Sequence, residues 1–135
     1  YGVPAAIAAK LVYPKKTVVS FNGDGCFMML GQEIINAIEN ELNPIFVIVN
    51  NEKLGTIRMH QEKKFPKRVM GTNIKNPDFV ALAKSYGLDS KRITNTEDFY
   101  GYFEKAKNNK KATLIELIID PNVLSPSLEI GTNIG

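Results

Sequence analysis

The stretch that decides the fold is residues 17–57, which read TVVSFNGDGCFMMLGQEIINAIENELNPIFVIVNNEKLGTI. It holds two apolar segments, 17–21 and 44–49, that have the length and composition of buried β-strands. Each breaks into polar residues that favour a turn, Asn-Gly-Asp-Gly at 22–25 and Asn-Asn-Glu-Lys-Leu-Gly at 50–55. The stretch therefore predicts two strands that each end in a polar loop.

Between these strands, residues 31–42 have the spacing of an amphipathic helix. The predicted apolar face consists of Ile34, Ile35, Ile38 and Leu42. A strand, a helix and a second strand without alternating polarity predict a βαβ unit with parallel strands and a right-handed crossover.

The chain outside this stretch continues the alternation. Residues 1–13 are rich in alanine, with Pro4 in the first turn, and predict a helix. We expect a short helix at 56–62, a loop at 63–75, and a helix that starts at 76–78 with Asn76 as its cap. Its buried face is predicted from Phe79, Val80, Leu82, Ala83 and Tyr86, with Gly87 after its end.

The last third of the chain predicts a strand, a helix and a strand. The strand covers 90–93, and Thr94 to Glu97 match a capping box before a helix whose face is Phe99, Tyr102, Phe103 and Ala106. Residues 112–119 are a buried strand. The whole order predicts an α/β domain with a parallel sheet flanked by helices over residues 1–121, and a C-terminal tail at 122–135.

A helix is an unusual first element for such a domain, so we expect a strand before it that this chain lacks. The chain opens on Tyr1 rather than Met, which favours a piece of a longer protein. No apolar run reaches the roughly 18–20 residues of a membrane span. The one cysteine permits no internal disulfide and fits a cytoplasmic protein.

The net charge of +3 comes largely from two lysine-rich segments, 63–68 and 105–111. They lack the interleaved aromatic residues of a nucleic-acid platform, so we interpret them as solvated surface and expect no nucleic-acid partner. The single histidine excludes a His-rich metal site.

The two polar loops carry the chemistry. The carboxyl ends of parallel strands meet at one edge of a sheet, which brings Asp24 and Asn51 together in the crevice where α/β proteins bind ligands. Gly23 and Gly25 permit positive φ and close approach of the backbone. Backbone N–H groups from Gly25 onward can point at an anion before the next helix. A carboxylate and an amide oxygen suit Mg²⁺, so the loops predict a metal–diphosphate anchor.

At these residues the sequence resembles thiamine-diphosphate-dependent enzymes, whose motif is Gly-Asp-Gly followed, about two dozen residues on, by Asn-Asn. The resemblance covers 1–121 and is closest to the acetolactate synthase branch, which includes related carboligases and 2-keto-acid decarboxylases. The matching segments are Tyr1 to Ile7, Gly23 to Gly25, Phe27 to Met29, Gln32-Glu33, Asn50-Asn51 and Asn76 to Phe79.

The resemblance implies roles for individual residues. Asp24, Asn51 and the backbone carbonyl of Lys53 would bind Mg²⁺, without any part for the Lys53 ammonium. The remaining implied positions touch the cofactor, and they are Gly23, Gly25, Cys26, Leu54 and Gly55.

It also implies what this chain lacks. The catalytic glutamate of the family lies in a separate pyrimidine-binding domain, so we expect an assembly with that domain, in the same chain or another. The whole protein is expected to be a homo-oligomer acting on a small 2-keto acid, and this chain alone is expected to be inactive. His60 stands where acetolactate synthases usually have tryptophan, and Cys26 replaces the commoner serine.

Other interpretations remain open on the sequence. A nucleotide-binding module is disfavoured, because there is no Gly-x-Gly-x-x-Gly after a strand and no Gly-x-x-x-x-Gly-Lys-Ser/Thr. A non-catalytic interaction domain derived from such an enzyme is the third candidate. Cys26 at a helix start could be a nucleophile, although a small residue in a tight loop is favoured. His60 could face a substrate channel or lie on the surface.

Overall fold

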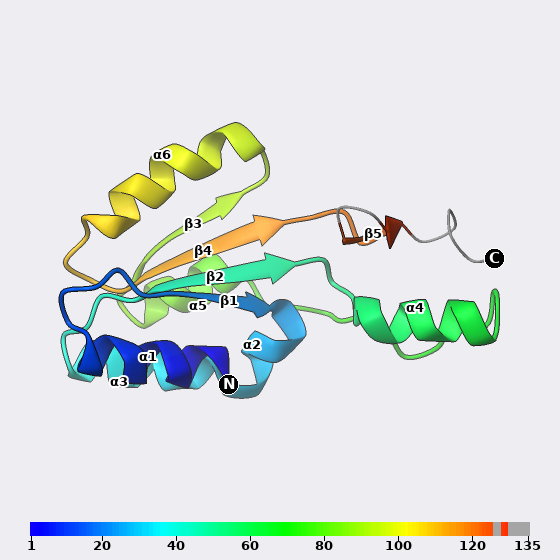
Figure 1. The fold of residues 1–135 in the computed structure, drawn as a ribbon, viewed down its shortest axis with the longest axis horizontal. Coiled ribbons are helices and arrows are strands. Elements are labelled where there is room, and N and C mark those ends of the chain that lie inside the picture. Colours follow the sequence, from blue (N-terminus) through cyan, green and yellow to red (C-terminus); the bar gives the residue numbers. More distant parts are fainter. Residues whose placement is uncertain (126–127, 130–135) are drawn as a thin grey trace.

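The computed structural model describes residues 1–125 and 128–129. Four strands form one parallel sheet in the order β1-β2-β4-β3 (Figure 1). Their bounds are Val19–Gly23 for β1, Ile45–Asn50 for β2, Asp89–Ile93 for β3 and Thr113–Ile118 for β4. The predicted α/β architecture with a parallel sheet is confirmed.

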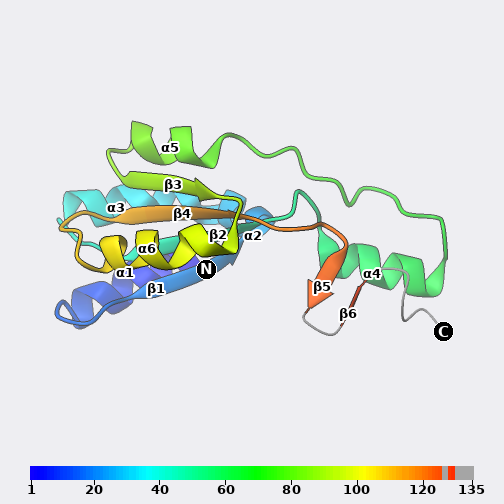
Figure 2. The ribbon, with the colours of Figure 1, turned by 90° about the horizontal axis from the view of Figure 1, so that it is seen from above.

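Helices cover both faces of this sheet (Figure 2). One face packs against α1 (Gly2–Val12), α2 (Asp24–Leu30), a 3₁₀ turn η1 (Gly31–Glu33), α3 (Ile34–Glu39) and α5 (Phe79–Ser85). The other face packs against α6 (Thr96–Lys107). The alternation of side chains along β2 supplies both cores, since Phe46 and Ile48 face the first layer while Ile45 and Val47 face α6.

The larger core holds a pair of aromatic rings that join two helices. Phe27 of α2 and Phe79 of α5 are 1% and 0% exposed, and their ring centroids lie 5.4 Å apart in an edge-to-face arrangement. This contact fixes α2, and with it the first polar loop, against the sheet.

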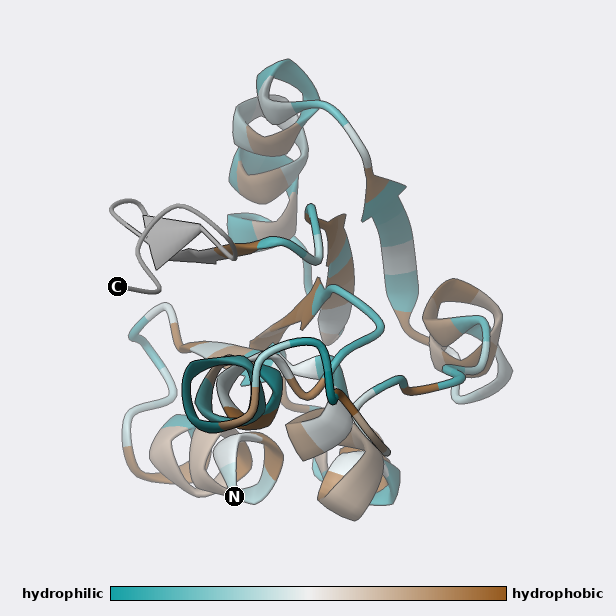
Figure 3. Ribbon diagram, turned by 90° about the vertical axis from the view of Figure 1, so that its right-hand side faces the viewer, coloured by the Kyte–Doolittle hydropathy of each residue, from teal (hydrophilic) through white to brown (hydrophobic). Residues whose placement is uncertain are grey.

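One helix projects beyond the carboxyl edge of the sheet. It is α4 (Gly55–Lys64), which has no buried residue, and in Figure 3 it is seen end-on and mostly hydrophilic. A short antiparallel pair, β5 (Val123–Ser125) and β6 (Leu128–Glu129), follows β4 at the same end. No helix in the described part of the chain is long and apolar enough to cross a membrane.

Several local predictions are corrected. The first strand runs two residues later than predicted, so Asn22 and Gly23 belong to β1 and Asp24 opens α2 directly. Ile35, placed on the buried face, is 42% exposed, whereas Ile34 and Ala37, three positions apart on α3, are buried and form that face.

The predicted caps of two helices are also wrong. Asp78, not Asn76, caps α5, and its carboxylate accepts from the Ala81 N–H at 3.0 Å. The Thr94–Glu97 capping box does not form, since Asn95 is the cap of α6 and makes no side-chain bond. Gly87 after α5 is confirmed as a left-handed glycine, with φ of 86°.

Candidate functional site

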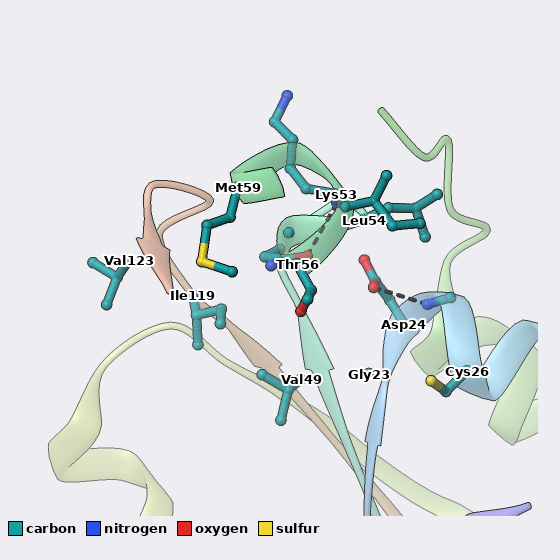
Figure 4. A pocket seen from close by; sticks show the side chains of 14 residues that line it. Gly23, Asp24, Cys26, Val49, Lys53, Leu54, Thr56, Met59, Ile119 and Val123 are labelled. Carbon is teal, nitrogen blue, oxygen red and sulfur yellow. Dashed lines mark hydrogen bonds between the residues drawn. The ribbon is translucent and has the colours of Figure 1, made fainter. Parts of the chain in front are cut away.

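The predicted site residues come together around one pocket at the carboxyl edge of the sheet (Figure 4). Its volume is about 570 Å³. The end of β1, the start of α2, the end of β2 and the start of α4 form it, and two apolar residues after β4 close one side. The lining residues are Gly23, Asp24, Gly25, Cys26, Val49, Asn51, Lys53, Leu54, Gly55, Thr56, Ile57, Met59, Ile119 and Val123.

Asp24 is the acidic centre of this pocket. Its side chain is 3% exposed and accepts three hydrogen bonds. Oδ1 accepts from the Gly25 N–H at 2.8 Å, while Oδ2 accepts from the Glu52 N–H at 2.8 Å and from Asn76 Nδ2 at 2.8 Å. These donors hold the carboxylate at the junction of both polar loops.

The second loop presents neutral oxygens to the same pocket. Asn51 Oδ1 accepts from the Lys53 N–H at 3.0 Å, which fixes the amide. The Lys53 ammonium bonds Asn73 Oδ1 and points away from Asp24 (Figure 4). Lys53 can therefore contribute to the site through its backbone rather than through its ammonium.

The oxygens of the pocket suit a hard cation. No salt bridge reaches Asp24 from any side chain of residues 1–123, although a buried carboxylate without a cation is costly. A carboxylate has about four acceptor positions, and the three donors leave one on Oδ1 open. The Asn76 side chain, which donates to Asp24 Oδ2, has a buried Oδ1 without a hydrogen-bond partner. No cluster of three His, Cys, Asp or Glu exists within the described residues, so amide and carbonyl oxygens would complete such a site.

The glycines of the first loop act through close packing, and the predicted positive φ is wrong. Gly23 has φ of −62° and Gly25 lies within α2. A Cβ on Gly25 would lie 3.1 Å from Ile74 Cδ1 and 3.3 Å from Leu54 Cδ2. The left-handed residue of the site is Glu52, with φ of 53°, which sequence reasoning did not single out.

The roles of Cys26 and His60 were left open by the sequence, and the two side chains differ in their position relative to the pocket. Cys26 is exposed and lines the pocket in the first turn of α2. His60 is exposed on α4 and does not line the pocket, whereas its neighbour Met59 does.

Three polar residues near the pocket were missed by sequence reasoning. Asn76, read as a helix cap, bonds Asp24 and also Asn50 Oδ1 at 2.9 Å. Asn50 bonds Glu116 Oε1 at 2.7 Å, and Glu116 is 1% exposed within the sheet. The signal for Glu116 was present, because a lone carboxylate in the apolar run Leu114 to Ile118 must find a buried partner.

Comparison with known proteins identifies the family of the chain. The family model described as thiamine pyrophosphate enzyme, C-terminal TPP binding domain, matches residues 1–117. The chain belongs to this family. The probable acetolactate synthase large subunit of Methanocaldococcus jannaschii is 33% identical over 132 residues, which are 97% of this chain and 22% of that protein. The large subunit of Escherichia coli acetolactate synthase isozyme 2 is 33% identical over 121 residues, 89% of this chain and 22% of that protein.

A solved structure supports the same family. The thiamine diphosphate-dependent 4-hydroxybenzoylformate decarboxylase of Rhodococcus jostii superposes with a TM-score of 0.82 at 28% identity, covering 88% of this chain and 23% of that one. The chain thus spans about a fifth of the length of these relatives. It is a thiamine-diphosphate-binding domain of the acetolactate synthase-like kind, which confirms the predicted resemblance and fold.

Proposed function

We propose that this domain binds Mg²⁺ and the diphosphate of thiamine diphosphate as part of an acetolactate synthase-like carboligase or 2-keto-acid decarboxylase. The observation that carries the proposal is the buried Asp24 carboxylate, which shares a pocket with Asn51 and has no cationic side chain among residues 1–123. A bound divalent cation would balance that charge and bridge it to an anionic ligand.

The protein ligands in this proposal are three oxygens. Asp24 supplies a charged oxygen through the open position on Oδ1, Asn51 supplies its amide oxygen, and Lys53 supplies its backbone carbonyl. Mg²⁺ favours six oxygen ligands and bridges phosphates readily, so diphosphate oxygens and water complete the set.

The diphosphate is held by the backbone on either side. The first turn of α2 presents the Cys26 N–H, which has no acceptor within the helix because α2 begins at Asp24. The start of α4 also lines the pocket, where the Gly55 N–H has no acceptor within the helix, whereas the Leu54 N–H already donates to the Thr72 carbonyl. Helix N-termini favour anions, so both helix starts support a diphosphate.

Thiamine diphosphate, when bound, supplies the carbanion chemistry that 2-keto acids need. This chain would bind and orient the cofactor through its diphosphate, while Val49, Met59 and Ile119 form an apolar wall that excludes water. The proposed catalytic partner is a pyrimidine-binding domain of the same or another chain, in a homo-oligomer. The 4-hydroxybenzoylformate named for the Rhodococcus relative and the acetolactate named for the others are why we propose a 2-keto acid substrate.

Calorimetric titration with thiamine diphosphate tests the proposal. We expect binding in the presence of Mg²⁺ and none after chelation, weak because a single domain supplies part of the site. Equal binding with and without the metal, or tighter binding of a nicotinamide dinucleotide, would favour the nucleotide-binding alternative and reject the proposal.

A further inference from the structure

A chain of hydrogen bonds leads from the pocket across the sheet to its far edge. Asn76 Nδ2 donates to Asp24 and to Asn50 Oδ1, and Asn50 Nδ2 donates to Glu116 Oε1 at 2.7 Å. Glu116 Oε2 accepts from Arg92 Nε at 2.6 Å, and Arg92 also bonds Asp78 at 3.1 Å. The network runs from the start of α2 through β2 and β4 to β3, the edge strand.

The central residues of this network are buried, and one of them is charged. Asn50 is 5% exposed and Glu116 is 1% exposed, and the Glu116 charge is balanced by Arg92, which reaches it from the solvent side. The pKa of Arg92 is raised, first by its hydrogen bond to Glu116 and further by the charges of Glu116 and Asp78. Removing Arg92 would leave the buried Glu116 carboxylate without a cation, which is costly, so this pair holds the Glu116 side chain in place.

The network determines how many acceptor positions Asp24 has left. Oδ2 takes two donors, the Glu52 N–H and Asn76 Nδ2, which fill both of its lone pairs. Oδ1 takes one donor, the Gly25 N–H, and keeps one position. Without Asn76, Oδ2 would regain a position and the carboxylate could present both oxygens to a cation.

Asn76 is itself held in place by the second loop. The segment 72–76 runs along that loop, because the Leu54 N–H donates to the Thr72 carbonyl at 2.8 Å and the Ile74 N–H donates to the Glu52 carbonyl at 2.9 Å. Asn76 is therefore bonded to Asp24 and Asn50, and its segment is bonded to the second loop. A residue that orients a metal ligand has to be held in this way.

We propose that Asn76 is a positioning residue that makes Asp24 a one-oxygen ligand, with Asn50, Glu116 and Arg92 holding the Asn76 amide in that orientation. The inference rests on the proposed binding of Mg²⁺ and thiamine diphosphate. Its consequence is metal selectivity. Mg²⁺ demands strict octahedral geometry from single oxygens, while Ca²⁺ accepts two-oxygen carboxylates and irregular geometry.

The test measures thiamine diphosphate binding to the 135-residue chain by calorimetry, with Mg²⁺ and separately with Ca²⁺. For Asn76→Ala we expect affinity in Mg²⁺ to fall by about ten- to a hundredfold and affinity in Ca²⁺ to fall much less. The side chain of Asn76→Ser is too short to reach Asp24, so this variant should show the same change in the ratio of the affinity in Mg²⁺ to the affinity in Ca²⁺. A fold that is merely weakened would lower both affinities together.

Asn43→Ala is the matched control. Asn43 is also half-buried and its side chain also donates to another segment, in one bond to the Asn109 carbonyl at 2.7 Å, but it lies just before β2, away from the pocket. For Asn43→Ala, the ratio of thiamine diphosphate affinities in Mg²⁺ and in Ca²⁺ should equal that of the unchanged chain.

The outcomes separate the two proposals. An unchanged ratio in both Asn76 variants, with metal-dependent binding intact in the parent chain, overturns the positioning role alone. Absence of metal-dependent binding in the parent chain overturns the proposed function, and the positioning role with it.

Discussion

The backbone N–H of Glu52 donates to Oδ2 of Asp24 at 2.8 Å, which joins the loop after β2 directly to the start of α2. The two residues lie 28 positions apart in sequence, and Glu52 has a φ of 53°. The left-handed conformation thus accompanies the bond that closes the pocket, so backbone geometry at Glu52 controls where Asp24 and Asn51 lie relative to each other.

Substitutions at Glu52 should therefore separate backbone from side-chain effects. Glu52→Pro removes the N–H and forces φ to about −65°, so we expect a loss of about 3 kcal/mol in the free energy of unfolding and loss of metal-dependent binding. Glu52→Gly keeps the conformation, and its stability should stay within about 1 kcal/mol. Urea unfolding checks both, and equal behaviour of the two variants would contradict this role of the backbone.

Gly31 should tolerate no side chain. A Cβ there would lie 2.6 Å from Phe27 Cε1, and that ring is wedged against Phe79. Gly31→Ala is therefore expected to lower the free energy of unfolding by about 1–3 kcal/mol. Gly101→Ala is the control, since no atom lies within 4 Å of its Cβ position in α6, and it should raise stability by about 0.5–1 kcal/mol. A stabilised Gly31→Ala variant would show that the core is looser than described.

Asp78 should make the stability of the fold depend on pH in the acid range. Its pKa is lowered from 3.8, first by the Ala81 N–H bond at the cap of α5 and also by the charge of Arg92. Because the pKa is lower in the folded state, the ionised Asp78 carboxylate stabilises the fold at every pH above its unfolded-state pKa. This stabilisation is lost as the pH falls through the folded-state pKa. Asp78→Asn keeps a cap and removes the charge.

Thermal unfolding of wild type and Asp78→Asn checks this sign. The wild type should have the higher midpoint at neutral pH, and the difference should shrink as pH falls below about 3.8. A difference that stays constant into strong acid would mean that the carboxylate charge plays no part.

Cys26 should act through its backbone. Cys26→Ser is expected to leave metal-dependent binding of thiamine diphosphate unchanged, because it keeps the N–H in the first turn of α2. Cys26→Pro removes that donor at a position where a helix tolerates proline, so affinity should fall roughly tenfold or more. Calorimetry distinguishes the two, and a loss of binding in Cys26→Ser would instead assign a role to the thiol.

The sequence was sufficient for the order of the four sheet strands along the chain and for the place of the pocket, but not for α2 as a separate helix or for β5 and β6. The apolar runs that became β2 and β4 have no alternative reading, and the polar residues after β1 and β2 mark the carboxyl edge where Asp24 and Asn51 meet. Each of these features depends on local periodicity, which a sequence carries directly.

Other features depend on contacts between distant segments. Asn76 is as good a helix cap by its chemistry as Asp78, and only the packing of segment 72–76 along the second loop turns it toward Asp24. Gly23 and Gly25, on either side of Asp24, could equally have taken positive φ, but β1 extends to Gly23 and α2 begins at once. The buried Glu116 has two partners, Asn50 on β2 and Arg92 on β3, so its pairing depends on the order of the strands in the sheet.

The central claim is that Asp24, Asn51 and the Lys53 carbonyl hold a metal that binds the diphosphate. Anomalous X-ray scattering from crystals of the chain grown with thiamine diphosphate and Mn²⁺ in place of Mg²⁺ tests it most directly. We predict one Mn²⁺ peak bonded to oxygens of these three residues and of the diphosphate. A diphosphate bound in the pocket without a metal peak, or a peak whose ligands exclude Asp24, would contradict it.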